Sequence, residues 1–169
     1  MKIKNNLILL KNNHSLLFEE FHFKCSVGKN GKTIKKIEGD KKTPKGIFKL
    51  GNLFYRNERV KRPFTKLNIN HIKPEMGWCN DIKNKKYYNK LVSIKYFKKS
   101  EKLFRNDYKY NYFIPILHNT KQTALGKGSA IFIHLTKNYK KTAGCIALSQ
   151  KDFLILVKLI NKNTKIKIC

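Results

Sequence analysis

Apolar and polar residues alternate in short segments along most of the chain, a pattern typical of half-buried β-strands. Residues 2–4, 15–18 and 21–27 alternate with a period of two. Residues 28–31 supply turn formers before a further segment over 33–37. We expect these segments to form an antiparallel meander.

Four later segments are rich in β-branched and aromatic residues, as expected for buried strands. They cover residues 47–50, 112–117, 130–134 and 164–168. The strand over 130–134 ends in a histidine and is followed by a polar loop. The pattern therefore predicts strands near both ends of the chain and in its second half.

One segment has the period of a helix. Ser149 stands three residues before Asp152, the spacing of a capping box, and the apolar residues that follow share one broad face. We expect a helix from Gln150 to about Asn161. Residues 55–94, by contrast, lack regular periodicity, and we interpret them as a long, partly structured excursion of the kind that often carries function.

The predicted fold class is β-rich, mainly β with one or two helices. The chain has 169 residues, of which 41% are hydrophobic and 12% aromatic, enough for one domain with a real core. Neither an internal repeat nor a linker divides the sequence. We therefore expect a single domain over residues 1–169.

The formal net charge of +28 changes the list of possible partners. Only four of the 38 basic residues are arginines, and the lysines are spread along the whole chain. A nucleic-acid reader is expected to use clustered basic residues and more arginine. We therefore interpret most of the charge as compositional and expect no specific nucleic-acid partner. A basic module that binds an anionic polymer remains an alternative from another class of function.

The cysteine spacing predicts free thiols. The four cysteines are far apart, with no CxxC pair and no zinc-finger spacing, so neither a metal, a cofactor nor a disulfide framework is expected. No apolar run approaches the roughly 20 residues of a membrane span. The apolar run of residues 7–10 is too short for a secretory signal. We expect a monomer without a membrane span.

The candidate chemistry centres on His134 and Cys145, eleven residues apart. A cysteine nucleophile needs a nearby base and a positive environment that stabilises the thiolate. The intervening loop contains three lysines, at positions 137, 140 and 141. Gly144 allows close approach of a substrate, and the amides beside Cys145 are candidate oxyanion donors. A buried cysteine beside a core histidine is the structural alternative.

The local sequence around these residues resembles a known active-site signature. Gly-Ser-Ala-Ile-Phe-Ile-His at 128–134 and Thr-Ala-Gly-Cys-Ile-Ala-Leu at 142–148 resemble the signature of the YkuD-type L,D-transpeptidase family. Supporting stretches lie at 27–31, at 39–48, which contains Thr-Pro-Lys-Gly-Ile-Phe, and at 77–81. Together they cover most of the chain from residue 25 onward.

The resemblance implies a β-rich L,D-transpeptidase-like catalytic domain that acts on peptidoglycan stem peptides. It implies that Cys145 attacks a stem-peptide carbonyl to form a thioacyl enzyme, that His134 is the general acid and base, and that the Gly144 backbone contributes to the oxyanion hole. Transfer to an amine makes a cross-link. Transfer to water makes the enzyme a carboxypeptidase or endopeptidase, which is the alternative within the same class.

The sequence departs from the commonest family pattern around the cysteine. Ala143 stands in place of a histidine and Ala147 in place of an arginine, whereas Thr142 fits the pattern. The loop between the two signature segments is also shorter. Arg105 or one of the lysines is expected to recognise the substrate carboxylate that the missing arginine would bind.

Other residues are candidates for substrate contacts. Thr142, Trp78 and Tyr88 are candidates for the groove, although aromatic residues are more often part of a core. Asn80 and Asp81 are candidates for orienting His134 or binding substrate, with a solvated turn as the alternative.

The expected localisation follows from the implied substrate. Peptidoglycan lies outside the cytoplasmic membrane, so we expect the cell envelope or periplasm. Because the sequence shows no signal peptide, the cytoplasm remains an alternative.

Overall fold

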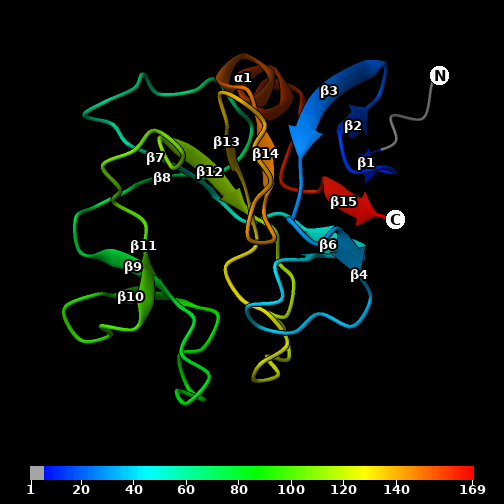
Figure 1. The fold of residues 1–169 in the computed structure, drawn as a ribbon. Coiled ribbons are helices and arrows are strands. Elements are labelled where there is room, and N and C mark those ends of the chain that lie inside the picture. The colour runs from blue at the N-terminus through cyan, green and yellow to red at the C-terminus, as the bar shows by residue number, and fades with distance from the viewer. Residues whose placement is uncertain (1–5) are drawn as a thin grey trace.

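The computed structural model describes residues 6–169 and is built mainly from β-strands (Figure 1). In chain order the strands are β1 (Leu7–Leu10), β2 (Ser15–Phe18), β3 (Phe21–Ser26), β4 (Lys32–Thr33), β5 (Thr43–Pro44), β6 (Gly46–Lys49), β7 (Leu53–Tyr55), β8 (Ile69–His71), β9 (Met76–Cys79), β10 (Leu91–Ser93), β11 (Ser100–Lys102), β12 (Tyr112–Pro115), β13 (Phe132–Leu135), β14 (Ile146–Leu148) and β15 (Lys165–Ile168). The helix is α1 (Gln150–Leu159). The predicted β-rich class is confirmed, and the strand expected over 2–4 falls outside the described residues.

Ten of the strands form one sheet, in the order β6-β15-β1-β2-β3-β14-β13-β12-β7-β8. Strands β1, β2 and β3 pair antiparallel in sequence order, which confirms the expected pairing of residues 15–18 with 21–27. The rest of the predicted meander is wrong, because β1 lies at Leu7–Leu10, where no strand was expected, and the next partner of β3 is β14. Strands β13 and β14 pair in parallel at the centre of the sheet. This pairing brings the two signature segments side by side.

The central strands are buried on both faces, and each face has its own partners. Ile133 and Leu135 of β13 belong to the larger apolar cluster, together with Phe153 of α1. Phe132, on the opposite side of the same strand, belongs to a second cluster with Trp78 of β9. Because successive strand residues point to opposite faces, one side of β13 packs against the helix and the other faces the small sheet.

Helix α1 begins as its sequence predicts. The Ser149 side chain accepts a hydrogen bond from the Asp152 amide at 3.1 Å, which caps the first turn. The helix ends at Leu159, about two residues before the expected end, because Ile160 has an extended backbone with ψ 164°. The predicted helix is confirmed with this shorter boundary.

The strand expected over 33–37 is wrong. Only Lys32 and Thr33 pair as a strand, and the next residues form a loop organised by the carboxylate of Asp40. This carboxylate accepts hydrogen bonds from the amides of Ile37 and Lys42, at 3.0 and 2.8 Å. A local carboxylate that binds backbone amides favours a turn over a strand, which a period-two pattern does not show.

The long excursion contains more regular structure than its sequence suggests. Strands β9 and β10 lie within it, and with β11 they form a three-stranded sheet in the order β10-β9-β11. This sheet lies below β12 in Figure 1, on the side opposite α1. The excursion therefore covers the second face of the central strands.

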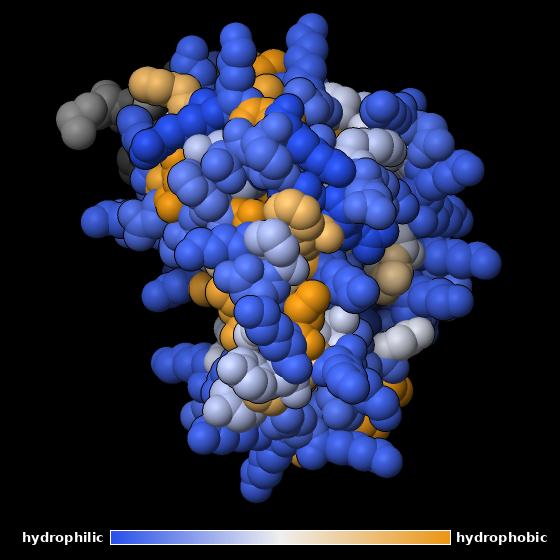
Figure 2. Space-filling model, turned by 90° about the vertical axis from the view of Figure 1, so that its left-hand side faces the viewer, coloured by the Kyte–Doolittle hydropathy of each residue, from blue (hydrophilic) through white to orange (hydrophobic). Residues whose placement is uncertain are grey.

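Hydrophilic side chains dominate the surface in Figure 2, and apolar residues appear there as separate small areas. None of the helical structure within residues 6–169 is long and apolar enough to cross a membrane.

Candidate active site

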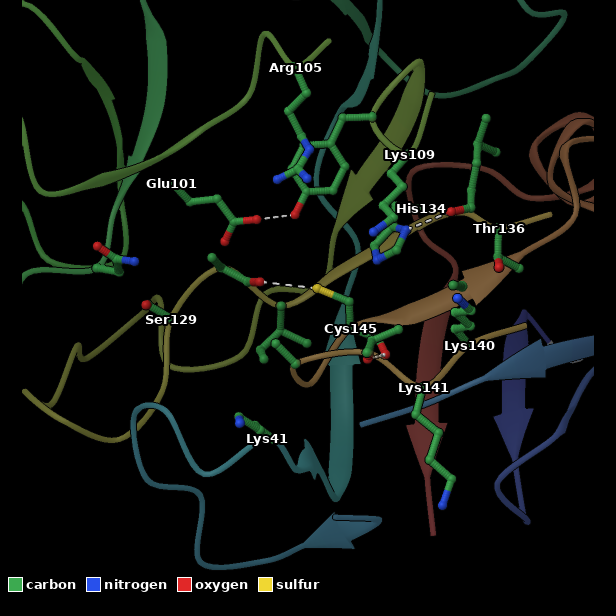
Figure 3. Close-up of a pocket in the computed structure, with 18 of the residues that line it drawn as sticks. Lys41, Glu101, Arg105, Lys109, Ser129, His134, Thr136, Lys140, Lys141 and Cys145 are labelled. Atoms are coloured by element: carbon green, nitrogen blue, oxygen red, sulfur yellow. Dashed lines mark hydrogen bonds between the residues drawn. The ribbon is translucent and has the colours of Figure 1, made fainter. Parts of the chain in front are cut away.

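The sheet register places His134 and Cys145 on the same face. His134 pairs with Ala147 across β13 and β14, and Cys145 stands two residues before Ala147. Residues two apart in an extended chain point to the same side. Figure 3 shows both side chains directed into one cavity, on the face opposite α1.

The cavity has a volume of about 590 Å³ and opens among charged side chains. Its wall combines residues from the signature segments with residues from the loops near β11 and β12. Those that matter for the chemistry are Lys36, Glu101, Arg105, Lys109, Tyr110, His134, Thr142 and Cys145.

The Cys145 thiol is buried and held by two backbone groups. It donates to the Ala130 carbonyl at 3.3 Å (Figure 3). It also accepts from the Phe132 amide at 3.3 Å. Ala130 has a positive φ of 51°, a conformation unusual for a residue other than glycine. This strained position directs its carbonyl at the sulfur.

Burial raises the pKa of the Cys145 thiol to about 12, and the negative charge of Glu101 acts in the same direction. The Phe132 amide and the Lys36 ammonium oppose this shift. The charges that act on the thiol therefore come from Glu101 and Lys36. The lysines of the 137–141 loop, expected to stabilise a thiolate, are not among these charges, although Lys140 and Lys141 line the cavity.

The imidazole of His134 is fixed in one tautomer. Its Nδ1 donates to the Leu135 carbonyl at 2.9 Å, which leaves Nε2 as the acceptor. Burial lowers the pKa of His134 to about 4, and the positive charges of Lys109 and Arg105 add to this effect. The ring is therefore neutral near pH 7 and able to take a proton at Nε2.

This contact also corrects an expectation about the residues that orient His134. Asn80 and Asp81 were candidates for this role, but His134 Nδ1 donates to the Leu135 carbonyl instead. Asn80 lines the cavity, and the Asp81 carboxylate accepts from the Lys83 amide in a turn.

The turn before Cys145 depends on a glycine and a buried threonine. Gly144 has φ 139°, and a Cβ at this position would lie 2.9 Å from the Lys42 carbonyl oxygen. The Thr43 hydroxyl donates to the Gly144 carbonyl at 2.9 Å and accepts from the Gly28 amide at 2.9 Å. Thr43, from the Thr-Pro-Lys-Gly-Ile-Phe segment, thus links three distant parts of the chain.

Thr142 closes the same turn. Its hydroxyl donates to the Cys145 carbonyl at 2.6 Å and accepts from the Gly144 amide at 3.1 Å. The role expected for the Gly144 amide, donation to an oxyanion, therefore requires that its bond to Thr142 open. Thr142 also lines the cavity.

Arg105 lines the cavity, but its charge is already paired. Its guanidinium binds Asp107, with the shortest contact at 2.6 Å, and lies 5.1 Å from the centre of the Tyr110 ring.

The two candidate groove aromatics lie behind the cavity wall. Trp78 packs edge-on against Phe132 with the ring centres 5.2 Å apart, and its indole donates to Asn89 at 2.9 Å. Tyr88 is fully buried, and its hydroxyl donates to Glu38. The alternative reading of both residues as part of the core is the one that fits.

Sequence reasoning missed Glu101 and Tyr110. The Tyr110 hydroxyl donates to the Glu101 carboxylate, and the Tyr110 ring lies edge-on to His134 with centres 5.4 Å apart. Their positions depend on how the three-stranded sheet β10-β9-β11 packs against the central strands, and no local sequence pattern predicts this packing. The one available signal is that Glu101 is one of only ten acidic residues in a chain with 38 basic ones.

The described residues offer no evident metal site. Within the range 6–169, no group of three or more His, Cys, Asp or Glu side chains has the arrangement needed to hold an ion.

Solved structures with a related fold are longer proteins. A variant of the helical cell shape determining protein Pgp2 from Campylobacter jejuni is 20% identical, with a TM-score of 0.51 over 96% of this chain and 46% of that one. An L,D-transpeptidase from Mycobacterium smegmatis is 12% identical, with a TM-score of 0.43 over 96% of this chain and 58% of that one. The chain thus spans about half the length of these proteins, and at 20% identity the similarity to Pgp2 concerns the fold alone.

A comparison with curated proteins finds no match. The family comparison is decisive, because residues 2–168 match the family described as YkuD, the L,D-transpeptidase catalytic domain. This match spans nearly the whole chain, including both segments that carry His134 and Cys145. The protein belongs to the YkuD family of L,D-transpeptidase catalytic domains.

Proposed function

We propose that this chain is one catalytic domain that transfers acyl groups between peptidoglycan stem peptides through a thioacyl enzyme. Cys145 is the nucleophile and His134 the general acid and base. The observation that carries the proposal is their shared cavity, with the Leu135 carbonyl fixing the imidazole so that Nε2 is the free acceptor. Membership of the YkuD family supplies the class of substrate.

Acylation begins from a neutral pair. The thiol gives its proton to Nε2 of His134 as the sulfur attacks the carbonyl carbon of the donor stem peptide. Because burial disfavours both the thiolate and the imidazolium, proton transfer and attack are expected to be coupled. The tetrahedral intermediate then collapses, the carbon–nitrogen bond breaks, and the leaving amine takes the proton from Nε2.

Deacylation reverses these roles. An amine of a second stem peptide attacks the thioester carbonyl, and Nε2 of His134 takes its proton. The carbon–sulfur bond breaks and the thiolate is reprotonated by His134. This completes a cross-link, whereas water in place of the amine gives hydrolysis.

The oxyanion needs donors near the sulfur. The Cys145 amide is our first candidate, and the Gly144 amide joins it if Thr142 releases its bond during the reaction. For the substrate carboxylate, Lys109 is a better candidate than Arg105, because Asp107 already neutralises the arginine. Lys109 lines the cavity, and its charge reaches His134.

Because peptidoglycan lies in the cell envelope, we expect the domain to act there, as a monomer. Neither transpeptidation nor hydrolysis of stem peptides needs a nucleic-acid partner.

The test is to incubate the protein with purified stem-peptide monomers and dimers and to follow products and thioacyl adducts by mass spectrometry. We expect an adduct on Cys145 in the wild type and none in Cys145→Ala, while His134→Ala forms it much more slowly. Cross-linked products identify transpeptidation, and shortened or separated stems identify hydrolysis. Equal inertness of wild type and Cys145→Ala, with no adduct from a carbapenem, would overturn the proposal.

A further inference from the structure

Glu101 occupies an unusual place for a carboxylate. It lies on β11, lines the cavity and points toward the side that holds Cys145 (Figure 3). Its side chain is half-buried, and desolvation raises the pKa of its carboxyl group. Its hydrogen-bond partner is the Tyr110 hydroxyl, a neutral group.

Glu101 takes part in none of the ion pairs of the described residues. Within residues 6–169, the ion pairs are Lys36 with Asp40, Arg56 with Glu58, and Arg105 with Asp107. Arg105 is the guanidinium nearest to Glu101 in the cavity wall, and it binds Asp107 through both Nε and a terminal nitrogen. Among the described residues the Glu101 carboxylate has the Tyr110 hydroxyl as its side-chain donor and no ion-pair partner, so it retains capacity for a positively charged group.

The carboxylate also works against the nucleophile. Its negative charge raises the pKa of the Cys145 thiol, although a cysteine nucleophile benefits from the opposite effect. The chain has 38 basic and only ten acidic residues, so a carboxylate in the cavity that holds the nucleophile calls for a functional explanation. A cation that bound Glu101 during the reaction would remove the unfavourable charge from the thiol's surroundings.

We propose that Glu101 is the binding residue for a primary ammonium group of the substrate, and that this binding promotes formation of the Cys145 thiolate. The inference rests on the proposed function, because stem peptides with a diamino acid supply such a group. Tyr110 holds the carboxylate in place through its hydroxyl. The cavity thus couples recognition of a cationic substrate to activation of the nucleophile.

Both stem peptides of the reaction, the donor and the acceptor, can carry a primary ammonium group. The ammonium belongs either to the donor stem that acylates Cys145 or to the acceptor stem that receives the acyl group. In the second case the ammonium first loses one proton to solvent, and the resulting amine passes its next proton to His134 as it attacks. Both cases use the same carboxylate, and the experiment separates them.

The first experiment needs no turnover. Alkylation of Cys145 by iodoacetamide at pH 8 is followed by peptide mass spectrometry, which resolves it from the other cysteines. We expect Glu101→Gln to react about 3- to 10-fold faster than the wild type, because loss of the charge lowers the pKa of the thiol. We expect ethylammonium chloride to accelerate the wild type and not the variant, with tetramethylammonium chloride at equal ionic strength as the reference salt.

Glu38→Gln is the matched control. Glu38 also lines the cavity and accepts a tyrosine hydroxyl, from Tyr88, but its charge is not among those that shift the pKa of Cys145. This variant should keep the wild-type response to ethylammonium. A wild type that responds equally to both salts overturns the proposal, and this comparison needs no variant to fold. If Glu101→Gln is folded and its Cys145 is alkylated at the wild-type rate, the proposal is overturned as well.

The second experiment identifies the source of the ammonium. Donor stems with a free or an acetylated side-chain amine are compared for the rate of adduct formation, and acceptor stems are compared in the same way for its decay. We expect Glu101→Gln to lower kcat/KM about 10- to 100-fold in one arm for the free amine and little for the acetylated form. Equal losses for both forms in both arms contradict the proposal. If no stem peptide acylates Cys145, the proposed function fails, while the alkylation result still decides whether Glu101 binds an ammonium group.

Discussion

The two faces of strands β13 and β14 differ in the residues that they carry and in what packs against them. On the face toward α1, alternate residues such as Ile133 and Ile146 pack in an apolar cluster with the helix. On the opposite face, the intervening positions hold His134 and Cys145, and polar groups from distant loops reach them. Strands β13 and β14 thus build a core on one side and a reactive cavity on the other.

The two faces also differ in how closely their function depends on the identity of single residues. The apolar face depends on volume and shape, which several hydrophobic residues can satisfy. The cavity face depends on single atoms, such as the Leu135 carbonyl at Nδ1 or the Ala130 carbonyl at the thiol. Changes on the first face should therefore cost stability, and changes on the second should cost chemistry.

The largest expected effect is the loss of the nucleophile. Cys145→Ala should lower the rate of acyl transfer at least about 10⁴-fold, because no other group in the cavity can form the thioacyl intermediate. The free energy of unfolding should change by only about 1 kcal/mol, since a small side chain is replaced by a slightly smaller one. Product formation and chemical denaturation measure the two quantities.

Cys79→Ala is the matched control for this change. Cys79 is a fully buried cysteine on β9 that does not line the cavity. The variant should keep its acyl-transfer rate per folded molecule. Similar rates for the two variants would contradict the assignment of the nucleophile.

The opposite result is expected on the helix face. Phe153 of α1 is fully buried and packs against Tyr112 with ring centres 5.9 Å apart. Phe153→Ala should lower the free energy of unfolding by about 3–5 kcal/mol, through lost burial and a residual cavity. The activity per folded molecule, measured well below the new melting temperature, should stay near the wild-type value. A loss of activity without a loss of stability would show that the two faces are not separable.

The sequence predicts the helix face better than the cavity face. The capping pair Ser149 and Asp152 and the apolar period of α1 are local signals, and they determine the helix almost to the residue. The class of fold follows from the many short apolar segments. These features depend on neighbours in the chain, which a pattern can show.

The cavity face depends on contacts between distant segments. His134 and Cys145 were predictable because each ends or precedes an apolar strand within a recognisable signature. The sequence does not announce that Glu101 and Tyr110 would join them, because β11 pairs with β9 in a region without clear periodicity. The Thr43 hydroxyl likewise reaches a residue 101 positions away, a separation that no local rule covers.

The third prediction concerns pH and His134. The pKa of this imidazole is 6.5 for an unperturbed histidine and about 4 in the folded protein, mainly because the ring is buried. The unfolded chain therefore binds a proton that the folded chain excludes between these values. This contribution to stability is present above about pH 6.5 and is lost as the pH falls toward 4, with a total of roughly 3 kcal/mol.

Thermal or chemical unfolding of the wild type and His134→Gln across this pH range measures the effect. The glutamine variant should show a clearly smaller loss of stability with acid. His118, whose pKa is also lowered by burial, contributes with the same sign, so the comparison between the two proteins is the relevant quantity. Parallel stability curves would show that His134 is not held neutral in the folded state.

The smallest expected effect tests how the cavity face is held from behind. Thr43→Val keeps the shape of the side chain but removes its bonds to the Gly28 amide and the Gly144 carbonyl. We expect the free energy of unfolding to fall by about 1–3 kcal/mol, because a buried amide and a buried carbonyl lose their partner. We also expect about 10-fold slower acylation with little change in KM, because the turn that positions Cys145 loses its support.

Thr164→Val supplies the matched comparison outside the cavity. The Thr164 hydroxyl is equally buried, bonding the Asn161 amide at 3.0 Å and the Asn6 side chain at 3.1 Å. This variant should lose a similar amount of stability and keep its acylation rate. If both threonine variants slow acylation equally, the loss reflects general loosening of the fold, and Thr43 has no separate role in positioning the nucleophile. A selective effect of Thr43→Val would show that the cavity face depends on one hydroxyl from a distant loop, where the helix face depends on shared packing.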